Sequence, residues 1–551
     1  MPSITVVHGY LLEGSGSNLW TRSVIIALCK AGHNVHFISQ EPHPELFSFI
    51  SKAYLYTTPT ERSTILDRES PYPGRVIMHK PKLSFLPVYV NDSYEEFSKD
   101  NVLPIPECSD QQLQTYVDIN YEVISRVLAE THPIYVHVNH TVLVSEAVRR
   151  ACLQSGHPFC VMPHGSAIQY AVLKDKRMMK VAESVFSDAT YIFTIGSEMV
   201  ERITGIWGQQ FTQKFRQLPL GCATDQFQMV KVTERPTVFN SLQMKLKKYI
   251  EEGNYGRQPE DVFRIERLSE EFCLGSMKQS KFVDRLTSLA CESWYNRKYP
   301  DQDAVEKLSR IDFVNDQVLL FCGRLISGKG LHCLLIVFPF LFKDNKSPWL
   351  VAVGHGPSRE ILESLIFALK HRDITSVFSI VNSAGDIEGS GGFSETVHFF
   401  EQLREKGLME EYLDRCRESL DRVIFLGYIP HDKGLSDLYA LSSIGVFPSI
   451  VKEAGPLVFI ESVACGAVPL GVYFGGMKYS IDKLEHHIDP DVWQCLKVTP
   501  EKTRICSNIM ESCQFLLTVC HCEQLRQQLR HVAETKFDWR HCVEIMTKVF
   551  E

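Results

Sequence analysis

The chain has 551 residues, of which 44% are hydrophobic and 23% are charged. This is the composition of a globular protein that is too long for one ordinary core, so we expect two domains of about 200–250 residues. The net charge of -8 excludes the strongly basic surface that is typical of nucleic-acid-binding proteins.

The first residues run directly into a strand-like pattern without a basic and then apolar leader, which predicts a cytoplasmic protein without a signal peptide. The longest apolar run, Cys333 to Phe342, is about half as long as a membrane-spanning helix, so only a peripheral membrane contact stays open. The cysteines are scattered and show no Cys-x2-Cys spacing, which favours reduced, buried thiols over a zinc site.

Residues 1–227 alternate short β-branched segments with longer helical patterns, as expected for an N-terminal Rossmann-like domain with a parallel sheet. Helices are predicted at Asn18–Ala31 and Gln111–Glu130. The predicted strands are Ile4–His8, Val35–Ser39, Ile134–Val138, Phe159–Met162 and Tyr191–Thr194.

Residues 228–313 carry charged helical patterns, such as Met244–Glu251 and Lys281–Arg297, and are predicted to be a helical insertion or linker. A second Rossmann-like domain follows in residues 314–522. Within it, residues 382–421 form another insertion, whose glycine-rich beginning is predicted to be a mobile loop. Four roles remain open for the two insertions: a lid, an acceptor-side element, an oligomer contact, or an addition without function. The predicted strands of this domain are Gln317–Cys322, Trp349–Val353, Val423–Leu426, Gly445–Pro448 and Val468–Val472.

Two carboxylates, Glu453 and Glu461, bracket the predicted start of a helix. We expect Pro456 at the first helical position, where its missing N–H costs nothing. The amides of Leu457 and Val458 would then face an anion in front of the helix. Glu453 can accept hydrogen bonds from sugar hydroxyls, and Glu461 can bind a vicinal diol such as that of a ribose. This arrangement suits a sugar nucleotide.

The segment from Gly323 to Gly330 opens the second domain at the end of a predicted strand. When a nucleoside diphosphate leaves a sugar, negative charge develops on its β-phosphate, and fixed cations stabilise that transition state more than the ground state. Arg324 can bind two phosphate oxygens, and Lys329 can act as a point charge. We therefore predict that these two side chains replace a metal ion, and that no obligatory metal or other cofactor is needed.

Residues Gly14, Ser15 and Gly16 follow the first predicted strand and precede a helix. Glycines at such a position let backbone amides approach a phosphate or a glycosyl group closely. The spacing is not the full Gly-x-Gly-x-x-Gly pattern, so a simple tight turn is the alternative interpretation.

The Glu-x7-Glu spacing, together with several other motifs in a fixed order, resembles the retaining glycosyltransferases of the GT-B fold, glycosyltransferase family 4. The resemblance implies an α/β protein whose two Rossmann-like domains face each other across a cleft, with residues 523–551 as a helix that crosses back to the N-terminal domain. The motifs are Gly14-Ser15-Gly16, Val161-Met-Pro-His164-Gly165, Leu218-Pro-Leu-Gly221, Gly323-Arg324 to Lys329-Gly330, Val353-Gly354-His-Gly356-Pro, Phe425-Leu-Gly427-Tyr428-Ile429 and Glu453 to Glu461.

The resemblance also implies individual roles. His164 would contact the donor sugar near the reacting carbon, the Gly14–Gly16 loop would lie over the donor diphosphate, and the backbone of Tyr428 or Ile429 would contact the nucleobase. One departure concerns the family's usual Glu-Gly-Phe-Gly, which is here Glu453-Ala-Gly455-Pro456. Because this change stiffens the turn beneath the sugar, the donor preference of the family cannot be transferred.

The implied activity is retaining transfer of a hexosyl unit from a UDP-, GDP- or ADP-sugar to a hydroxyl acceptor. The implied catalytic residues are His164, Arg324, Lys329 and Glu453, and the leaving phosphate oxygen would accept the acceptor's proton. A GT-B epimerase or phosphorylase, or a scaffold that binds a nucleotide sugar without turnover, is the alternative. The intact cations and glutamates argue against the scaffold. Family acceptors include sugars, sugar phosphates, inositols, lipids and proteins, and an oligomer stays open.

Overall fold

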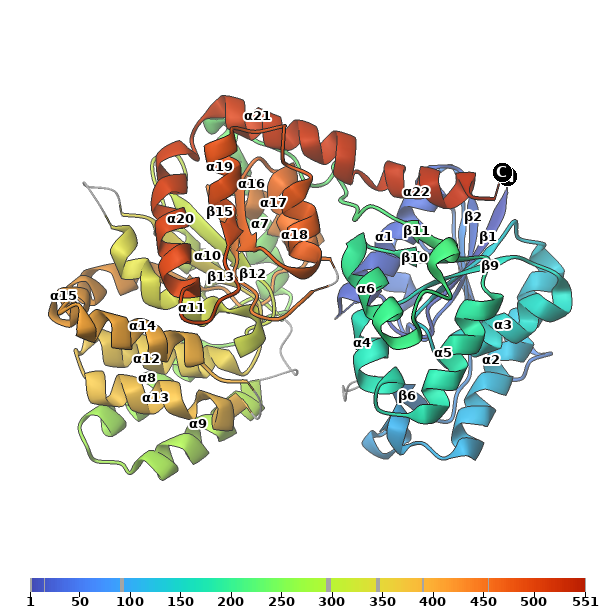
Figure 1. Ribbon diagram of the computed structural model, residues 1–551, viewed down its shortest axis with the longest axis horizontal. Coiled ribbons are helices and arrows are strands. Elements are labelled where there is room, and N and C mark those ends of the chain that lie inside the picture. The colour runs from blue at the N-terminus through green and yellow to red at the C-terminus, as the bar shows by residue number, and fades with distance from the viewer. Residues whose placement is uncertain are drawn as a thin grey trace. The chain divides into compact units, whose positions relative to one another are not determined.

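The computed structural model describes residues 2–13, 15–89, 94–293, 299–342, 347–388, 391–453 and 455–550. The chain forms two compact units (Figure 1). The first unit contains Met1–Gly221 together with Phe537–Glu551, and the second contains Cys222–Lys536. Each unit has its own sheet and its own core, so each is described separately.

The described part of the first unit contains a nine-stranded sheet in the order β11-β10-β9-β8-β1-β2-β5-β3-β4. Neighbouring strands are parallel except for β3 and β4, which form an antiparallel pair. The strands are β1 (Ser3–Val7), β2 (Asn34–Ile38), β3 (Lys52–Tyr56), β4 (Arg62–Asp67), β5 (Val76–Pro81), β8 (Val136–Asn139), β9 (Phe159–Met162), β10 (Tyr191–Thr194) and β11 (Phe215–Gln217), and β6 (Leu86–Val88) pairs with β7 (Val102–Pro104).

The five strands predicted for this unit are confirmed within two residues, whereas β3, β4, β5, β6, β7 and β11 were not predicted. The expectation of a purely parallel sheet is wrong at its edge, where β4 runs antiparallel to β3. The reason is physical: β4 is an edge strand with mostly exposed side chains, so it needs no continuous apolar run.

Helices surround this sheet, and the last of them comes from the end of the chain. In α22 (Trp539–Lys548), the ring of Trp539 packs so closely on Gly221 that a β-carbon there would lie 2.1 Å from it. Trp539 also meets Trp20 of α1 (Gly16–Lys30) with 6.2 Å between ring centroids. The other helices of the unit are α2 (Asp110–Thr131), α3 (Val144–Ser155), α4 (Gly165–Ala167), α5 (Lys176–Asp188) and α6 (Gly196–Trp207).

The described part of the second unit contains a six-stranded parallel sheet in the order β14-β13-β12-β15-β16-β17. The chain adds β13 and β14 on one side of β12 and then crosses to add β15 on the other side. The topological switch point therefore lies between β12 and β15, where ligands of such sheets bind at the carboxyl ends of the strands. The strands are β12 (Val318–Cys322), β13 (Trp349–Val353), β14 (Val423–Phe425), β15 (Ile444–Phe447), β16 (Val468–Val472) and β17 (Lys497–Val498).

Two Rossmann-like sheets are thus confirmed. In the second unit all five predicted strands form, and only the short β17 was missed. The sheet is buried because its strands are almost wholly apolar, which is typical of parallel strands covered on both faces. The helices of this sheet are α11 (Leu331–Val337), α12 (Ser358–Lys370), α13 (Ile374–Glu388), α14 (Ser394–Glu405), α15 (Met409–Ser419), α16 (Leu435–Leu441), α17 (Leu457–Ala464), α18 (Gly475–Asp482), α19 (Pro490–Cys495), α20 (Ile505–Val519) and α21 (Glu523–Val532).

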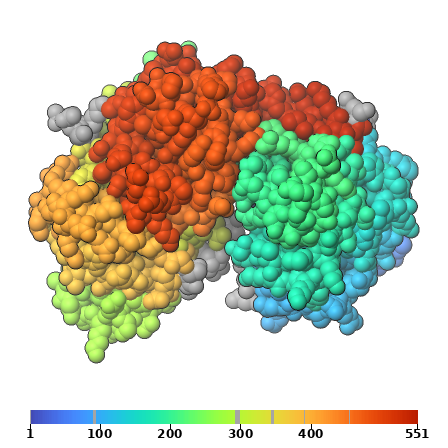
Figure 2. Space-filling model, viewed as in Figure 1, coloured from blue at the N-terminus to red at the C-terminus, as the bar shows by residue number. Residues whose placement is uncertain are grey.

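Residues 228–313 are helical and belong to the second unit. Within this unit α8 packs on α12, α9 on α13, and α7 on α16. The yellow-green atoms of α8 and α9 form one end of the unit's surface in Figure 2. The division at residue 227 stays a prediction, since the structure separates its compact units after Gly221. The helices are α7 (Arg235–Glu251), α8 (Pro259–Cys273), α9 (Gln279–Ser293) and α10 (Ala304–Leu308).

The mobile loop predicted from residue 382 onward is wrong for its first part, because α13 continues to Glu388. Val377, Ile380, Val381 and Ala384 are buried at helical spacing, and this burial outweighs the helix-breaking tendency of Gly385. Residues 389 and 390 lie outside the described part of the chain.

Within the described residues, no helix has the length and apolar character needed to cross a bilayer.

Candidate functional site

The loops that follow β12 and β15 are locked together at the switch point of the second unit. Gly330 has φ of +72°, and a β-carbon on it would lie 1.9 Å from the carbonyl oxygen of Pro448. The carbonyl of Gly328 accepts hydrogen bonds from the Ile450 amide at 3.0 Å and the Ser449 hydroxyl at 3.1 Å. Glycine is therefore required at residue 330 for both its conformation and its closeness to the neighbouring loop.

This contact brings together two predicted site residues that are far apart in sequence. Lys329 Nζ donates to Glu453 Oε2 at 2.6 Å, and the two side chains are 27% and 21% exposed. Arg324 lies exposed on the same loop, next to Gly323, which follows β12. Lys329 and Glu453 are both partly exposed, so this ion pair can be reached from solvent.

The backbone of Glu453 is held by the start of α18. The Glu453 carbonyl accepts a hydrogen bond from the Gly476 amide at 2.7 Å, and a β-carbon on Gly475 would lie 3.0 Å from the same oxygen. The glycine pair after β16 therefore positions the turn that carries Glu453, a role that the motif analysis missed. Its signal was present in the sequence, since a strand followed by glycines and a helix is typical of ligand-binding turns.

Helix α17 begins one residue later than predicted. Pro456 is the N-cap residue with φ of -82° and ψ of 99°, so the expectation that it occupies the first helical position is wrong. Because the ψ angle of Pro456 is extended, this residue lies outside the helix, and Leu457 and Val458 are the first two residues of α17. Their N–H groups still have no carbonyl partner one turn back within the helix. Both amides therefore remain suited to an anion at this end.

Glu461 lies inside α17, with a side chain that is 7% exposed. Its Oε1 pairs with His431 Nε2 at 3.1 Å, whereas its Oε2 is buried without a hydrogen-bond partner among the described residues. Burial, together with its contacts to the Cys322 thiol and the Glu461 carboxylate, raises the pKa of Tyr439 well above its usual value. Glu461 is thus held by His431 and lies against Tyr439 within the second unit, and its contact with a ribose stays a prediction.

His431 is a residue of this site that the motif analysis did not identify. It begins the short 3-10 helix after β14, and its side chain connects this loop to Glu461 of α17. No local sequence signal marks it, because its partner is 30 residues away.

The loops after β13 and β14 also meet through their backbones. The Gly354 amide donates to the Gly427 carbonyl at 2.8 Å, and the Tyr428 amide donates to the Tyr299 carbonyl at 3.0 Å. Ile429 is fully buried. The N–H of Tyr428 is thus already used, and a nucleobase contact through this residue would have to use its carbonyl group.

A second carboxylate, from Glu388, reaches the loop after β12. Its oxygens accept hydrogen bonds from the Ser327 amide at 2.9 Å, from the Ser327 hydroxyl at 3.1 Å and from the Ser358 hydroxyl at 2.9 Å. Glu388 is the last residue of α13, so this residue from the 382–421 segment supports the loop that carries Arg324 and Lys329. The motif analysis missed it because the contact spans 61 residues of sequence.

The remaining predicted residues belong to the first unit. His164 is the N-cap of the short helix α4, and its Nε2 lies 3.2 Å from Asn139 Oδ1. Burial, reinforced by the nearby His8 and His137, lowers the pKa of His164 to about 3, so its imidazole is neutral at physiological pH. Ser15 is the N-cap of α1 and accepts a hydrogen bond from the Asn18 amide.

Gly16 is the first residue of α1, and Gly14 lies outside the described residues. Across the part of the chain that the structure describes, no group of three or more histidine, cysteine, aspartate or glutamate side chains is arranged to hold a metal ion. The predicted independence of metal stays a prediction.

Comparisons with known proteins agree with this fold. Residues 406–496 match the family model described as "Glycosyl transferases group 1". This segment includes Glu453, Glu461 and His431, whereas Arg324 and Lys329 precede it in the sequence and are not part of the match. No curated protein matches the chain.

Several solved structures match over the whole chain. Sucrose-phosphate synthase from Thermosynechococcus elongatus has 16% identity and a TM-score of 0.53, covering 100% of this chain and 98% of the other. The catalytic domain of starch synthase IV from Arabidopsis thaliana, bound to ADP and acarbose, has 10% identity and a TM-score of 0.53, with coverage of 100% and 98%. Anabaena HepE in complex with UDP has 11% identity and a TM-score of 0.50, with the same coverage. The chain therefore has the GT-B fold, and residues 406–496 of it match the glycosyl transferases group 1 model.

Proposed function

We propose that the protein is a retaining glycosyltransferase that moves a hexosyl unit from a nucleotide-diphospho-sugar to a hydroxyl acceptor. The observation that carries the proposal is the contact between Lys329 and Glu453 at the switch point of the second unit, in front of the first amides of α17. The match of residues 406–496 to group 1 glycosyl transferases supports it.

The donor diphosphate binds between the loop after β12 and the start of α17. Arg324 and Lys329 neutralise the charge that develops on the leaving phosphate, and the amides of Leu457 and Val458 add hydrogen bonds to it. Lys329 exchanges Glu453 for the phosphate when the donor binds. Glu453 is then free to accept hydrogen bonds from the hydroxyls of the donor sugar.

The nucleoside extends toward the loop after β14. Glu461 binds the ribose diol, while His431 holds its Oε1 in place. The nucleotide is a UDP-, GDP- or ADP-type donor. HepE is seen with bound UDP and starch synthase IV with bound ADP. These two structures support a nucleoside diphosphate as the part of the donor that the second unit binds.

The acceptor hydroxyl attacks the same face of the sugar from which the diphosphate leaves. The leaving phosphate oxygen accepts the acceptor's proton, so no side chain has to act as a nucleophile. His164 contributes a neutral imidazole that hydrogen-bonds the donor sugar, because its lowered pKa removes a positive charge that would repel an oxocarbenium-like sugar. The cations of the second unit act on the leaving group without any metal.

A thermal-shift screen of nucleotides and nucleotide sugars tests the proposal. A ligand present at about 100 times its dissociation constant adds roughly 2.7 kcal/mol to the stability of the folded protein, which is a readily measured increase in Tm. The expected result is stabilisation by a nucleoside diphosphate and its sugar conjugate, followed by release of nucleoside diphosphate on incubation. Stabilisation without turnover of any donor would indicate a binding scaffold, and no stabilisation by any nucleotide would refute the proposal.

A further inference from the structure

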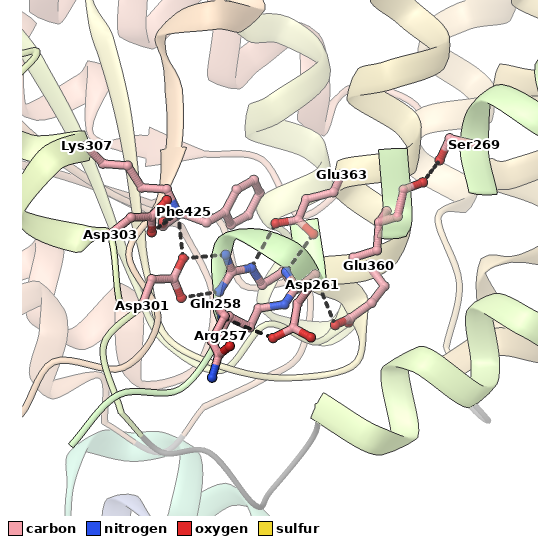
Figure 3. Close-up of polar contacts among 12 residues, drawn as sticks. Arg257, Gln258, Asp261, Ser269, Asp301, Asp303, Lys307, Glu360, Glu363 and Phe425 are labelled. Carbon is pink, nitrogen blue, oxygen red and sulfur yellow. Dashed lines mark hydrogen bonds and ion pairs between the residues drawn. The ribbon is translucent and has the colours of Figure 1, made fainter. Parts of the chain in front are cut away.

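The two units contain buried polar networks of different kinds. In the second unit an ion network joins the 228–313 region to α12 (Figure 3): Arg257 pairs with Glu363 at 2.6 Å, and Asp301 binds Arg359 through two hydrogen bonds. These charges compensate one another within the unit, so this network joins elements and needs no ligand. The first unit instead contains a chain of uncharged hydrogen bonds that leads to a histidine of the candidate site.

The chain begins in α1, at the buried side chain of Thr21. Its hydroxyl donates to the Ser17 carbonyl at 2.8 Å, which lies one turn earlier in the helix. Because a carbonyl oxygen can only accept, this bond uses the single hydroxyl proton of Thr21. The hydroxyl oxygen also lies 2.7 Å from Asn139 Nδ2 and must accept a hydrogen bond there. His8 Nδ1, at 3.3 Å, is a more distant partner for the Thr21 proton, and a bond to it would leave the Asn139 contact unchanged.

This direction fixes the side-chain amide of Asn139, the last residue of β8. Because Nδ2 donates to Thr21, the amide oxygen Oδ1 faces the other way, toward two imidazoles. His164 Nε2 lies 3.2 Å from Oδ1, and His137 Nε2 lies 3.4 Å from it. An amide oxygen has two lone pairs and no proton, so each of these ring nitrogens carries a hydrogen. Asn139 is fully buried, which shields these bonds from solvent.

His164 is therefore the Nε2–H tautomer, with a lone pair on Nδ1. Burial lowers the pKa of His164 to about 3, so the ring is neutral and has only one N–H. The rings of Trp20 and His140 lie 6.1 and 4.9 Å from the His164 ring, between centroids, and oppose its rotation. Nδ1 has no hydrogen-bond partner among the described residues, and it is not enclosed by protein as both ring nitrogens of His140 are. The half-buried imidazole thus presents an acceptor and no donor to a ligand.

We propose that Asn139 is a positioning residue that holds His164 in the Nε2–H tautomer, so that Nδ1 accepts a hydrogen bond from a hydroxyl of the donor sugar. This inference rests on the proposed function and deepens it, because it states which atom of His164 meets the sugar and which chemical group that atom takes. The opposite tautomer would present an N–H in place of the acceptor. Asn139 is buried and acts only through the imidazole.

NMR of the full-length protein, labelled with ¹⁵N in its histidines, tests the tautomer without any ligand. The signals of His164 are identified by their absence in His164→Gln. A protonated Nε2 and a bare Nδ1 are expected in the wild type and in Thr21→Ser, which keeps the hydroxyl. Asn139→Leu removes the acceptor, and Thr21→Val frees the amide of Asn139 to turn, so both variants are expected to show a mixture of tautomers.

A protonated Nδ1 in the wild type, or a wild-type tautomer in Asn139→Leu, would overturn the inference. A wild-type tautomer in Thr21→Val would overturn the part played by α1.

Calorimetry tests the contact with the sugar by comparing two ligands: the nucleoside diphosphate that stabilises the protein best among UDP, GDP and ADP, and its glucose conjugate. Asn139→Leu is expected to weaken the conjugate by about 2- to 13-fold, the range for losing one hydrogen bond, and to leave the bare nucleoside diphosphate unchanged. The matched control is Asn120→Leu in α2, because Asn120 is also a buried amide of the first unit. It is expected to change neither ligand.

The possible outcomes separate positioning from a general structural role. Equal weakening of both ligands in Asn139→Leu would indicate damage to the fold and overturn the positioning role. Wild-type affinity for the conjugate in Asn139→Leu would overturn the contact between Nδ1 and the sugar. Failure of the wild-type protein to bind any nucleoside diphosphate would refute the proposed function and the sugar contact with it, whereas the tautomer is decided by NMR alone.

Discussion

Replacing Lys329 or Arg324 with alanine tests the charge stabilisation at the centre of the proposed site. In the structure Lys329 Nζ lies 2.6 Å from Glu453 Oε2, and both side chains are partly exposed. An ion pair of this kind stabilises the protein by about 0–1 kcal/mol, so donor binding loses little when Lys329 leaves Glu453. Loss of a transition-state charge partner costs much more, about 2.7–4 kcal/mol. We therefore expect kcat/KM to fall by about 10²–10³ in each variant, mainly through kcat.

The assay is release of nucleoside diphosphate from the donor identified by thermal shift, with water as the acceptor. Lys247→Ala is the charge-matched control for Lys329, because Lys247 lies on α7 with a side chain that is 68% exposed. Arg267→Ala in α8 is the charge-matched control for Arg324, because the Arg267 side chain is 71% exposed. Both controls should keep wild-type rates. Near-normal turnover in Lys329→Ala and Arg324→Ala together would refute the assignment of the cations.

Three further outcomes are expected. Glu461→Ala should weaken calorimetric binding of the bare nucleoside diphosphate, because a ribose partner is lost, while Glu453→Ala should leave that binding nearly intact and impair transfer; equal loss in both would contradict the division of roles. Activity should survive a titration with EDTA, and inactivation that only a divalent ion reverses would mean that the two cations are insufficient. The free energy of unfolding, measured in urea, should fall from about pH 6.5 toward pH 4. Burial lowers the pKa of His8 and of His137 from 6.5 to about 4, so the unfolded chain binds more protons than the folded protein in that window. Equal stability at pH 7.5 and pH 5 would show that these histidines do not stay neutral in the folded protein.

The sequence was informative where burial imposes a pattern. Strands such as β13 and β16 are apolar along their whole length, and their predicted bounds match the structure. The polar edge strand β4 and the three-residue strand β11 carry no such pattern, because the neighbouring strand supplies their hydrogen bonds whatever their side chains are. The helical spacing of apolar residues in α13 was masked by its glycine and serine content.

The candidate site divides in the same way. Lys329 and Glu453 belong to local motifs that could be recognised separately, but their 2.6 Å contact depends on how the loops after β12 and β15 pack. His431 and Glu388 could not be predicted, because each acts through a partner that only the folded chain brings near. Pro456 was misplaced by one residue because a proline suits both the N-cap region and the first helical position, and only its ψ of 99° decides between them.

The most direct test of the proposed function is proton NMR of the product formed from an α-linked nucleotide sugar. The proposed site places Arg324 and Lys329 at the leaving diphosphate and uses the leaving oxygen as the base, so the acceptor must attack the face from which the diphosphate departs. An α-linked anomeric centre in the first product formed is the expected result. A β-linked product would require attack from the opposite face and would contradict the mechanism.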